Sequence, residues 1–94
     1  MIYSVEVIIE NKKSARDPEG ETIYTQLVLK KGFKQVESVR SGKYLRFKVD
    51  AENMESAIEL VREICSRLRI YNPAIHDIEV RPYPKHGSYK VSRN

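Results

Sequence analysis

The hydrophobic and polar positions of the first ten residues alternate along the chain. This period of two is typical of a strand with one face turned to the core, so we expect a strand over residues 2–9. One face of this strand consists of Tyr3, Val5, Val7 and Ile9, and the other consists of Ser4, Glu6 and Ile8.

The next patterned segment indicates a helix over residues 18–31. Asp17 precedes it as a capping side chain, and Pro18 suits the first helical position. Ile23 and Leu27 follow at helical spacing, and Gly32 is placed as a left-handed stop.

Two strands joined by a tight turn are predicted after this helix. Residues 35–40 form a weakly apolar strand, Ser41-Gly42 reads as a hairpin turn, and residues 43–49 alternate clearly. One face of the second of these strands consists of Leu45, Phe47 and Val49, and the other consists of Tyr44, Arg46 and Lys48.

A second helix is the most regular element of the pattern. Asp50 or Asn53 can cap it, and its end comes before Asn72-Pro73, because a residue before proline avoids the helical region. Ile78 and Val80 mark a last strand that stops near Tyr83. The apolar stripe of the helix consists of Ala57, Ile58, Val61, Ile64, Cys65 and Leu68.

The element order β-α-β-β-α-β predicts an α+β fold. We expect a two-layer sandwich, with two helices on one face of a four-stranded antiparallel sheet. Residues 1–83 form this single domain, and residues 84–94 are expected to be a basic, disordered tail. Because the first strand carries apolar side chains on both faces, a homo-oligomer would cover the second face.

Composition limits the number of domains and the classes of function that this chain can have. A chain of 94 residues allows one domain, and part of its net charge of +4 sits in the tail at Lys85, Lys90 and Arg93. The single cysteine, Cys65, cannot form a disulfide within the chain, which favours a reducing compartment. No stretch approaches the ~20 apolar residues of a membrane span, so we expect a cytoplasmic protein with no membrane partner.

The candidate reactive groups do not form an active site. Cys65 lies in the apolar stripe of the second helix, His76 opens a strand beside Asp77, and His86 falls in the tail. The four glycines are isolated, and the Cys and His residues lack metal-site spacing. We therefore expect no catalytic residue, metal site or cofactor in this chain.

An RNA- or small-ligand-binding domain is the alternative, because the RNA-recognition fold has the same element order. That fold requires aromatic side chains on one exposed sheet face. Tyr44 and Phe47 are three residues apart and so lie on opposite faces, while Arg46 and Lys48 beside Tyr44 are expected on a solvated polar face.

Three segments together resemble the PurS family, the small subunit of phosphoribosylformylglycinamidine synthase. They are Asp17-Pro18-Glu19-Gly20, the segment from Val36 to Tyr44, and Asn72-Pro73-Ala74-Ile75-His76-Asp77. The similarity runs in order from about residue 2 to residue 82. The chain departs from the family at residues 12–16, which are more polar, and in the tail from Pro84 onward.

The resemblance implies a part in purine (IMP) biosynthesis. In this family, the complex converts formylglycinamide ribonucleotide, glutamine and ATP to formylglycinamidine ribonucleotide, glutamate, ADP and phosphate. A glutaminase, PurQ, releases ammonia, and a synthetase, PurL, uses ATP and Mg²⁺. PurS acts as a homodimeric or tetrameric clamp between them, without nucleic acid.

The same resemblance implies contact residues for the partner subunits. The matched positions at the helix start and the hairpin are Asp17, Pro18, Gly20, Arg40, Gly42, Lys43 and Tyr44. Capping and turn geometry explain Asp17, Pro18 and Gly42, whereas Arg40 and Lys43 have no evident local structural role. The predicted partner contacts are Arg40, Lys43, Tyr44 and Asp17.

Overall fold

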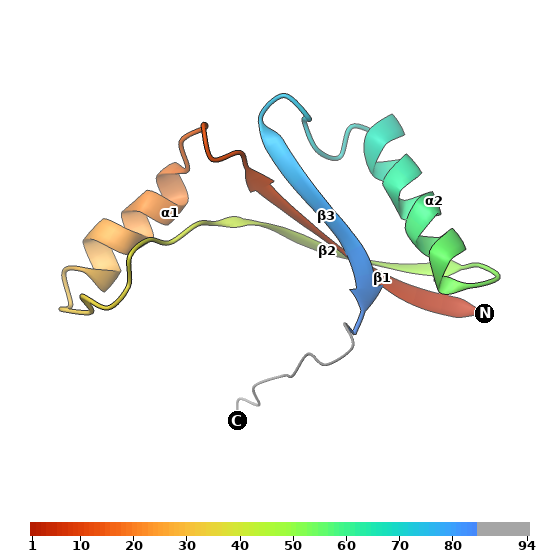
Figure 1. Cartoon of the computed structure of the whole chain (residues 1–94), viewed down its shortest axis with the longest axis horizontal. Coiled ribbons are helices and arrows are strands. Elements are labelled where there is room, and N and C mark those ends of the chain that lie inside the picture. Colours follow the sequence, from red (N-terminus) through yellow and green to blue (C-terminus); the bar gives the residue numbers. More distant parts are fainter. Residues whose placement is uncertain (85–94) are drawn as a thin grey trace.

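A computed structural model describes residues 1–84 of the chain (Figure 1). Its elements, in order, are strand β1 (Ile2–Asn11), helix α1 (Pro18–Thr22), π-helix η1 (Ile23–Val28), strand β2 (Gly42–Asp50), helix α2 (Met54–Arg67) and strand β3 (His76–Tyr83). The predicted tail, apart from Pro84, lies outside the described residues, as does His86.

The three strands form one antiparallel sheet in the order β2-β1-β3. The predicted alternation of β1 is confirmed, because Val5, Val7 and Ile9 are buried on the face toward α2. In register, Val7 lies between Leu45 of β2 and Val80 of β3. The central strand thus supplies most of the sheet's share of the core.

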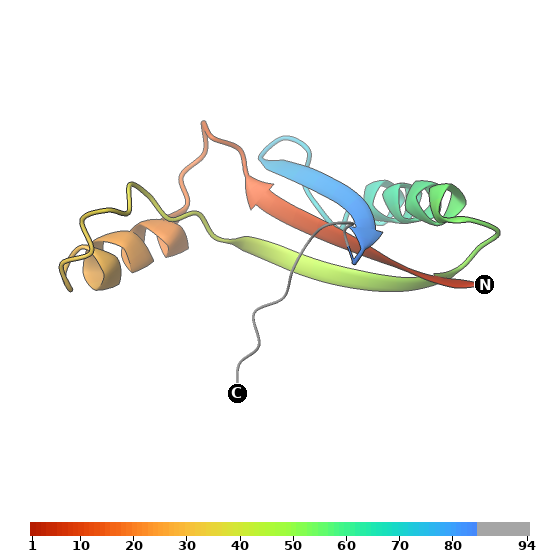
Figure 2. The same ribbon diagram turned by 60° about the horizontal axis from the view of Figure 1, so that its bottom comes forward.

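Helix α2 packs on this face of the sheet and completes the core (Figure 2). Of the two predicted caps, Asn53 takes the role: its side-chain oxygen accepts the backbone N–H of Ser56 at 2.8 Å. Ala57, Val61 and Cys65 are wholly buried at a spacing of four residues, as their apolar pattern predicted.

The predicted fourth strand is absent from the described residues. Residues 36–41 have no regular structure and pair with no strand, and their half-buried positions, Val36, Val39 and Ser41, do not follow the period of two of a strand. The predicted Ser41-Gly42 hairpin turn is wrong as well, because β2 begins at Gly42, which pairs with Glu10 of β1. The two-layer α+β architecture is confirmed with three strands.

The first helix begins at Pro18 as predicted, but it ends at Val28 rather than at residue 31, it continues as a π-helix from Ile23, and its position differs from the prediction. Asp17 caps α1, and Gly32 has the left-handed φ of +90°. However, α1 and η1 project beyond the end of β1 and pack neither on the sheet nor on α2 (Figures 1 and 2). We call residues 18–36 the arm. The prediction that both helices lie on one face of their own sheet is therefore wrong for α1.

Candidate assembly interface

Asp17 joins the arm to the start of β2. One carboxylate oxygen accepts the Gly20 backbone N–H at 3.2 Å and the Ser41 hydroxyl at 2.6 Å, and the other accepts the Ser41 backbone N–H at 2.6 Å. The side chain is buried. One acidic group therefore fixes two segments that are 24 residues apart in sequence.

Gly20 allows these two segments to touch. A Cβ atom at this position would lie 2.5 Å from the Val39 carbonyl oxygen and 2.6 Å from an Asp17 carboxylate oxygen. No larger residue fits without moving the backbone. The Asp-Pro-x-Gly motif thus has a structural explanation: capping by Asp17, a first-turn proline, and a glycine at a close backbone approach.

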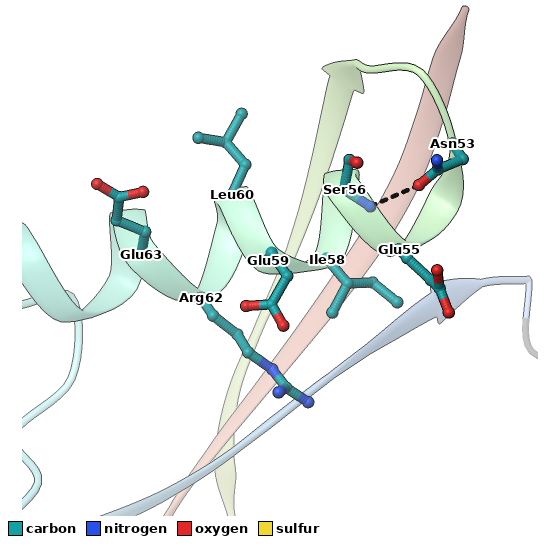
Figure 3. A pocket seen from close by; sticks show the side chains of 8 residues that line it. All are labelled: Asn53, Glu55, Ser56, Ile58, Glu59, Leu60, Arg62 and Glu63. Carbon is teal, nitrogen blue, oxygen red and sulfur yellow. Dashed lines mark hydrogen bonds between the residues drawn. The ribbon is translucent and has the colours of Figure 1, made fainter.

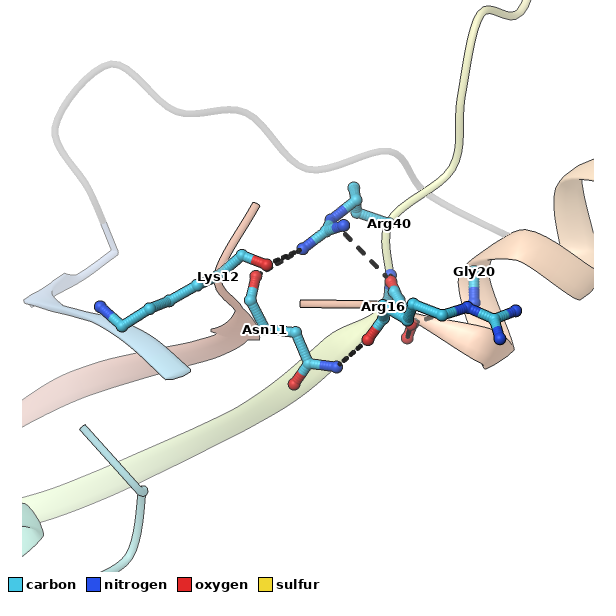
Figure 4. A network of polar contacts seen from close by, with 7 residues as sticks. Asn11, Lys12, Arg16, Gly20 and Arg40 are labelled. Atoms are coloured by element: carbon cyan, nitrogen blue, oxygen red, sulfur yellow. Dashed lines mark hydrogen bonds and ion pairs between the residues drawn. The ribbon is translucent and has the colours of Figure 1, made fainter. Parts of the chain in front are cut away.

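Arg40 links the end of β1 to the segment before β2 at the same place (Figure 4). Its guanidinium donates to the backbone carbonyls of Asn11 and Lys12, and the Asn11 side-chain amide donates to the Arg16 carbonyl at 2.8 Å. The Arg40 Nε lies 4.0 Å from Asp17. Arg40 therefore has a structural role, contrary to the prediction. We call this group the arm root: Asn11, Lys12, Arg16, Asp17, Gly20, Arg40 and Ser41.

Hydrogen bonds control the charge of the arm root. The Ser41 hydroxyl and the Ser41 and Gly20 backbone amides lower the pKa of Asp17, with a smaller contribution from Arg40, and outweigh the opposing effect of burial. Asp17 is therefore ionised at neutral pH and accepts its three hydrogen bonds as a carboxylate.

Lys43 lies beside the arm root at a surface pocket of about 460 Å³. The Lys43 residue is exposed, and among the described residues its side-chain ammonium group forms no hydrogen bond or ion pair. His76 lines the same pocket, and its Nδ1 accepts the Asn72 backbone N–H at 2.9 Å. The pocket lining is Ile9, Asn11, Asp17, Pro18, Glu19, Ser41, Gly42, Lys43, Ile70 and His76.

Tyr44 points to the opposite face of the sheet. Its hydroxyl donates to Glu6 at 2.7 Å, and Glu6 also pairs with Arg81 of β3. Burial alone would raise the pKa of Glu6, but the hydrogen bonds from Tyr44 and Arg81 and the charge of Arg81 lower it. The structure therefore brings Asp17, Arg40 and Lys43 together at one end of the sheet and leaves Tyr44 outside this group.

The face that carries Tyr44 is not a base-stacking platform. Tyr44 and Phe47 lie on opposite faces, because they pair with Ile8 and Val5 of β1, as predicted. The Arg46 guanidinium stacks 3.6 Å from the centre of the Tyr83 ring, and its Nε donates to the Tyr44 hydroxyl at 3.3 Å. The cations and aromatic rings of this face thus contact one another, which disfavours the RNA-binding alternative.

Cys65 is buried in the core beneath α2. Its exposed area is zero, and burial raises the pKa of its thiol, so it packs as a small apolar side chain, as predicted. Within residues 1–84, no three His, Cys, Asp or Glu side chains gather in a way that could hold a metal ion. No helix of the described chain is long and apolar enough to span a membrane.

Sequence reasoning missed Ser41, Glu6 and Arg81. The sequence predicts Ser41 only as part of a turn. Its hydrogen bond to Asp17 joins residues 24 positions apart, and no local pattern indicates such a contact. Glu6 was correctly placed on the second face of β1, and the alternation of β1 with β3 would have placed Arg81 across from it.

Comparison with known proteins identifies a family. Residues 4–83 match the family model PurS, described as phosphoribosylformylglycinamidine (FGAM) synthase. The chain is 36% identical over 80 residues to the phosphoribosylformylglycinamidine synthase subunit PurS of Thermotoga maritima, covering 85% of this chain and 95% of the relative. It is 39% identical to the PurS subunit of Methanocaldococcus jannaschii over 85% and 94% of the two chains.

Solved structures agree with these relatives. The crystal structure of the T. maritima purS subunit superposes with a TM-score of 0.78 at 35% identity, over 87% of this chain and 92% of the other. A chain in the structure of PurLQS from T. maritima superposes with a TM-score of 0.77 at 32% identity, over 87% and 98%. The fold and the sequence thus point to the same group of proteins.

Proposed function

The chain belongs to the PurS family, and from this premise we propose that it is the small, non-catalytic subunit of phosphoribosylformylglycinamidine synthase. The complex would convert formylglycinamide ribonucleotide, glutamine and ATP to formylglycinamidine ribonucleotide, glutamate, ADP and phosphate in purine biosynthesis. The observation that carries this proposal is the match over residues 4–83, together with the superposition on a chain of PurLQS.

The role that fits this chain is a bridge between the glutaminase PurQ and the synthetase PurL. Ammonia released into water at neutral pH becomes mostly ammonium, which has lost its nucleophilic electron pair. Transfer between two active sites therefore requires subunits held tightly together. In this proposal, ATP and Mg²⁺ are used by the synthetase, and this chain supplies neither a cofactor nor a catalytic residue.

The predicted contact residues take different parts in this proposal. Lys43 is the direct contact, because its ammonium group is exposed and unpaired among the described residues. Asp17 and Arg40 hold the arm root and act on assembly through the position of the arm. Tyr44 is 47% exposed on the other face, where it is available to a different neighbour.

We propose that the subunit works as a homodimer, or as a tetramer built from dimers, in the cytoplasm. A reducing compartment agrees with Cys65, which is present as a free thiol. A dimer would also cover the apolar side chains that the single chain exposes on its arm, among them Leu27 and Phe33.

The test compares two nitrogen sources. Synthase activity of PurL and PurQ is measured with and without this chain, once with glutamine and once with free ammonia. We expect the chain to be required with glutamine and dispensable with ammonia. If it changes neither activity, the proposed function is wrong. If both activities need it, the chain also shapes the synthetase site, and a pure bridging role is wrong.

A paired charge reversal tests Lys43. Lys43→Glu should weaken binding to the partner subunits and reduce glutamine-dependent synthesis, because it replaces an exposed cation at the proposed contact. Lys48→Glu is the control, since it makes the same change on the same strand but on the opposite face, across from Ser4. Equal binding by the two variants in a pull-down with PurL and PurQ would remove Lys43 from the interface.

A further inference from the structure

The outer face of α2 carries a surface pocket whose lining is mostly negative (Figure 3). The pocket has a volume of about 980 Å³, and its charged lining consists of Glu55, Glu59 and Glu63 against one cation, Arg62. All four of these residues are exposed. They belong neither to the core nor to the arm root, so no feature described above accounts for this acidic face.

Two of the three carboxylates have no cationic partner within residues 1–84. Glu63 forms an ion pair with Arg67 at 2.7 Å, whereas no ion pair of the described residues includes Glu55 or Glu59. Glu55 lies in the first turn of α2, where the helix dipole stabilises a negative charge. Glu59 lies further along the helix and has no such local role. A cation from outside α2 would therefore meet two unpaired carboxylates one turn apart.

The same pocket contains apolar surface. Leu60 is 42% exposed, and Ile58 is half-buried in the lining. Figure 3 shows Ile58 directed toward β3 and Leu60 directed away from it. A segment that carries both cations and apolar side chains therefore matches this face better than a simple counterion does.

Strand β3 ends at the end of the sheet where α2 begins. Strand β2 ends at Asp50, which pairs with Ile2, and α2 starts shortly after it. Strand β3 ends at Tyr83, which pairs with Ser4 of the same central strand. The chain therefore leaves β3 close to the first turn of α2.

The register of α2 along β3 places Glu55 level with the end of this strand. Arg62 shares a pocket with Val80 of β3. From Arg62 back to Glu55 the helix covers about 10 Å, and from Val80 forward to Tyr83 the strand covers about 10 Å as well. Figure 3 shows the Glu55 side chain directed toward the end of β3, in agreement with this estimate.

The sequence that follows Pro84 has the complementary character. Residues 85–94 include no acidic residue and carry three cations, two of them with apolar neighbours in the sequence. The cations are Lys85, Lys90 and Arg93, and the apolar residues are Tyr89 and Val91. We call residues 85–93 the basic segment. Its charge is opposite to that of the pocket, and its apolar residues match the exposed Leu60.

The basic segment has the length and the attachment point to reach the whole pocket. When fully extended it spans up to about 30 Å, whereas α2 is about 21 Å long. Lys85 follows Pro84 directly, so the attachment at the end of β3 brings the first cation of the segment to the level of Glu55.

Attachment also makes weak contacts sufficient for binding. Single exposed ion pairs contribute little and are screened by salt. Because the basic segment is already joined to β3, its binding does not require two molecules to meet, and its local concentration at α2 is roughly millimolar. We therefore expect a contact that forms at low ionic strength and is lost at high ionic strength.

We propose that the basic segment binds across the outer face of α2 of the same chain, where its cations pair with Glu55 and Glu59. Tyr89 and Val91 then cover Leu60. Side-chain contacts alone hold the segment in this arrangement, which requires no helix or strand within it. The proposal goes beyond the proposed function, in which the basic segment has no part.

A spin label near the end of the basic segment tests the contact in the full chain. Ser92→Cys supplies the reactive thiol, because Cys65 is wholly buried and is protected from the label. The amide NMR signals of Glu59 and Leu60 should be broadened at about 20 mM salt and should recover at about 1 M salt. Signals that are equally sharp at both salt concentrations would overturn the proposal.

Charge reversal tests the two carboxylates. Glu55→Lys with Glu59→Lys should abolish the broadening at Leu60, and adding Lys85→Glu with Lys90→Glu should restore it. Glu10→Lys with Glu37→Lys is the matched control, since it makes the same change in charge at exposed positions outside α2 and should leave the broadening unchanged. Circular dichroism verifies that each variant retains its helices. Equal broadening in the helix variant and the control would reject Glu55 and Glu59 as the binding site.

A mixture of chains identifies which copy supplies the segment. Isotope-labelled wild-type chain is mixed with spin-labelled chain that carries no isotope. We expect the Leu60 signal to stay sharp in this mixture, because each basic segment occupies its own α2. Broadening as strong as in the chain that carries both labels would mean that the segment comes from a second copy, and binding within one chain would be wrong.

Discussion

Gly20→Ala is the most direct test of the arm root. The new methyl group would lie 2.5 Å from the Val39 carbonyl oxygen and 2.6 Å from Asp17. Forcing extra volume into a packed site costs roughly 1–3 kcal/mol, whereas alanine in place of glycine within a helix gains about 1 kcal/mol. The two effects oppose each other, and we expect a net loss of about 1 kcal/mol in the free energy of unfolding.

Urea unfolding at a fixed protein concentration measures this loss, and amide hydrogen exchange locates it. In Gly20→Ala, the Ser41 amide should exchange faster, because its bond to Asp17 is disturbed. Gly32→Ala is the matched control: Gly32 has φ of +90° and no atom within 4 Å of a Cβ, so its cost is backbone strain alone. The Ser41 amide should stay protected in that control.

One result would refute the reasoning about the arm root. If Gly20→Ala is as stable as the wild-type chain or more stable, and the Ser41 amide remains protected, helix propensity outweighs the clash. The close approach of Gly20 to Val39 would then not restrict this position, and the glycine of the motif would need another explanation.

Three further predictions concern pH and the core. Because the pKa of Asp17 is lowered in the folded state, Asp17 contributes stability that is present above its unfolded pKa of ~3.9 and is lost as the pH falls through the lower folded value. Hydrogen exchange of the Ser41 amide between pH 2 and 6 measures this loss, and Asp17→Asn should abolish the pH dependence. Tyr44→Phe should raise the pKa of Glu6 and reduce stability at pH 7, with the difference from wild type vanishing at low pH in the same urea series. Val61→Ala should cost about 2 kcal/mol in urea unfolding, because it leaves a cavity at a wholly buried site.

The sequence predicted the elements whose signals are local. The alternation of β1, the Asn53 cap and the left-handed conformation of Gly32 each depend on neighbours within a few residues, and the structure confirms all three, although the helix before Gly32 ends at Val28. The stripe of α2 was predicted correctly at Ala57 and Val61 for the same reason.

Other features depend on residues far apart along the chain. Ser41 bonds Asp17 across 24 residues, and Arg40 bonds the Asn11 carbonyl across 29, so neither partner could be read from spacing. The position of α1 was predicted from the rule that an amphipathic helix covers its own sheet. The rule does not hold for α1, because the hydrogen bonds of Asp17 and Arg40 at the arm root hold the arm beyond the end of β1.

Within residues 1–84, β2 and β3 are the edge strands of the sheet, and both carry features that oppose further strand pairing. Strand β2 exposes Lys43, Arg46 and Lys48, and charged side chains along an edge oppose the approach of another strand. Strand β3 contains Pro82, which removes one hydrogen-bond donor and is tolerated because β3 is an edge strand. These edges therefore oppose open-ended growth of the sheet from one copy of the chain to the next.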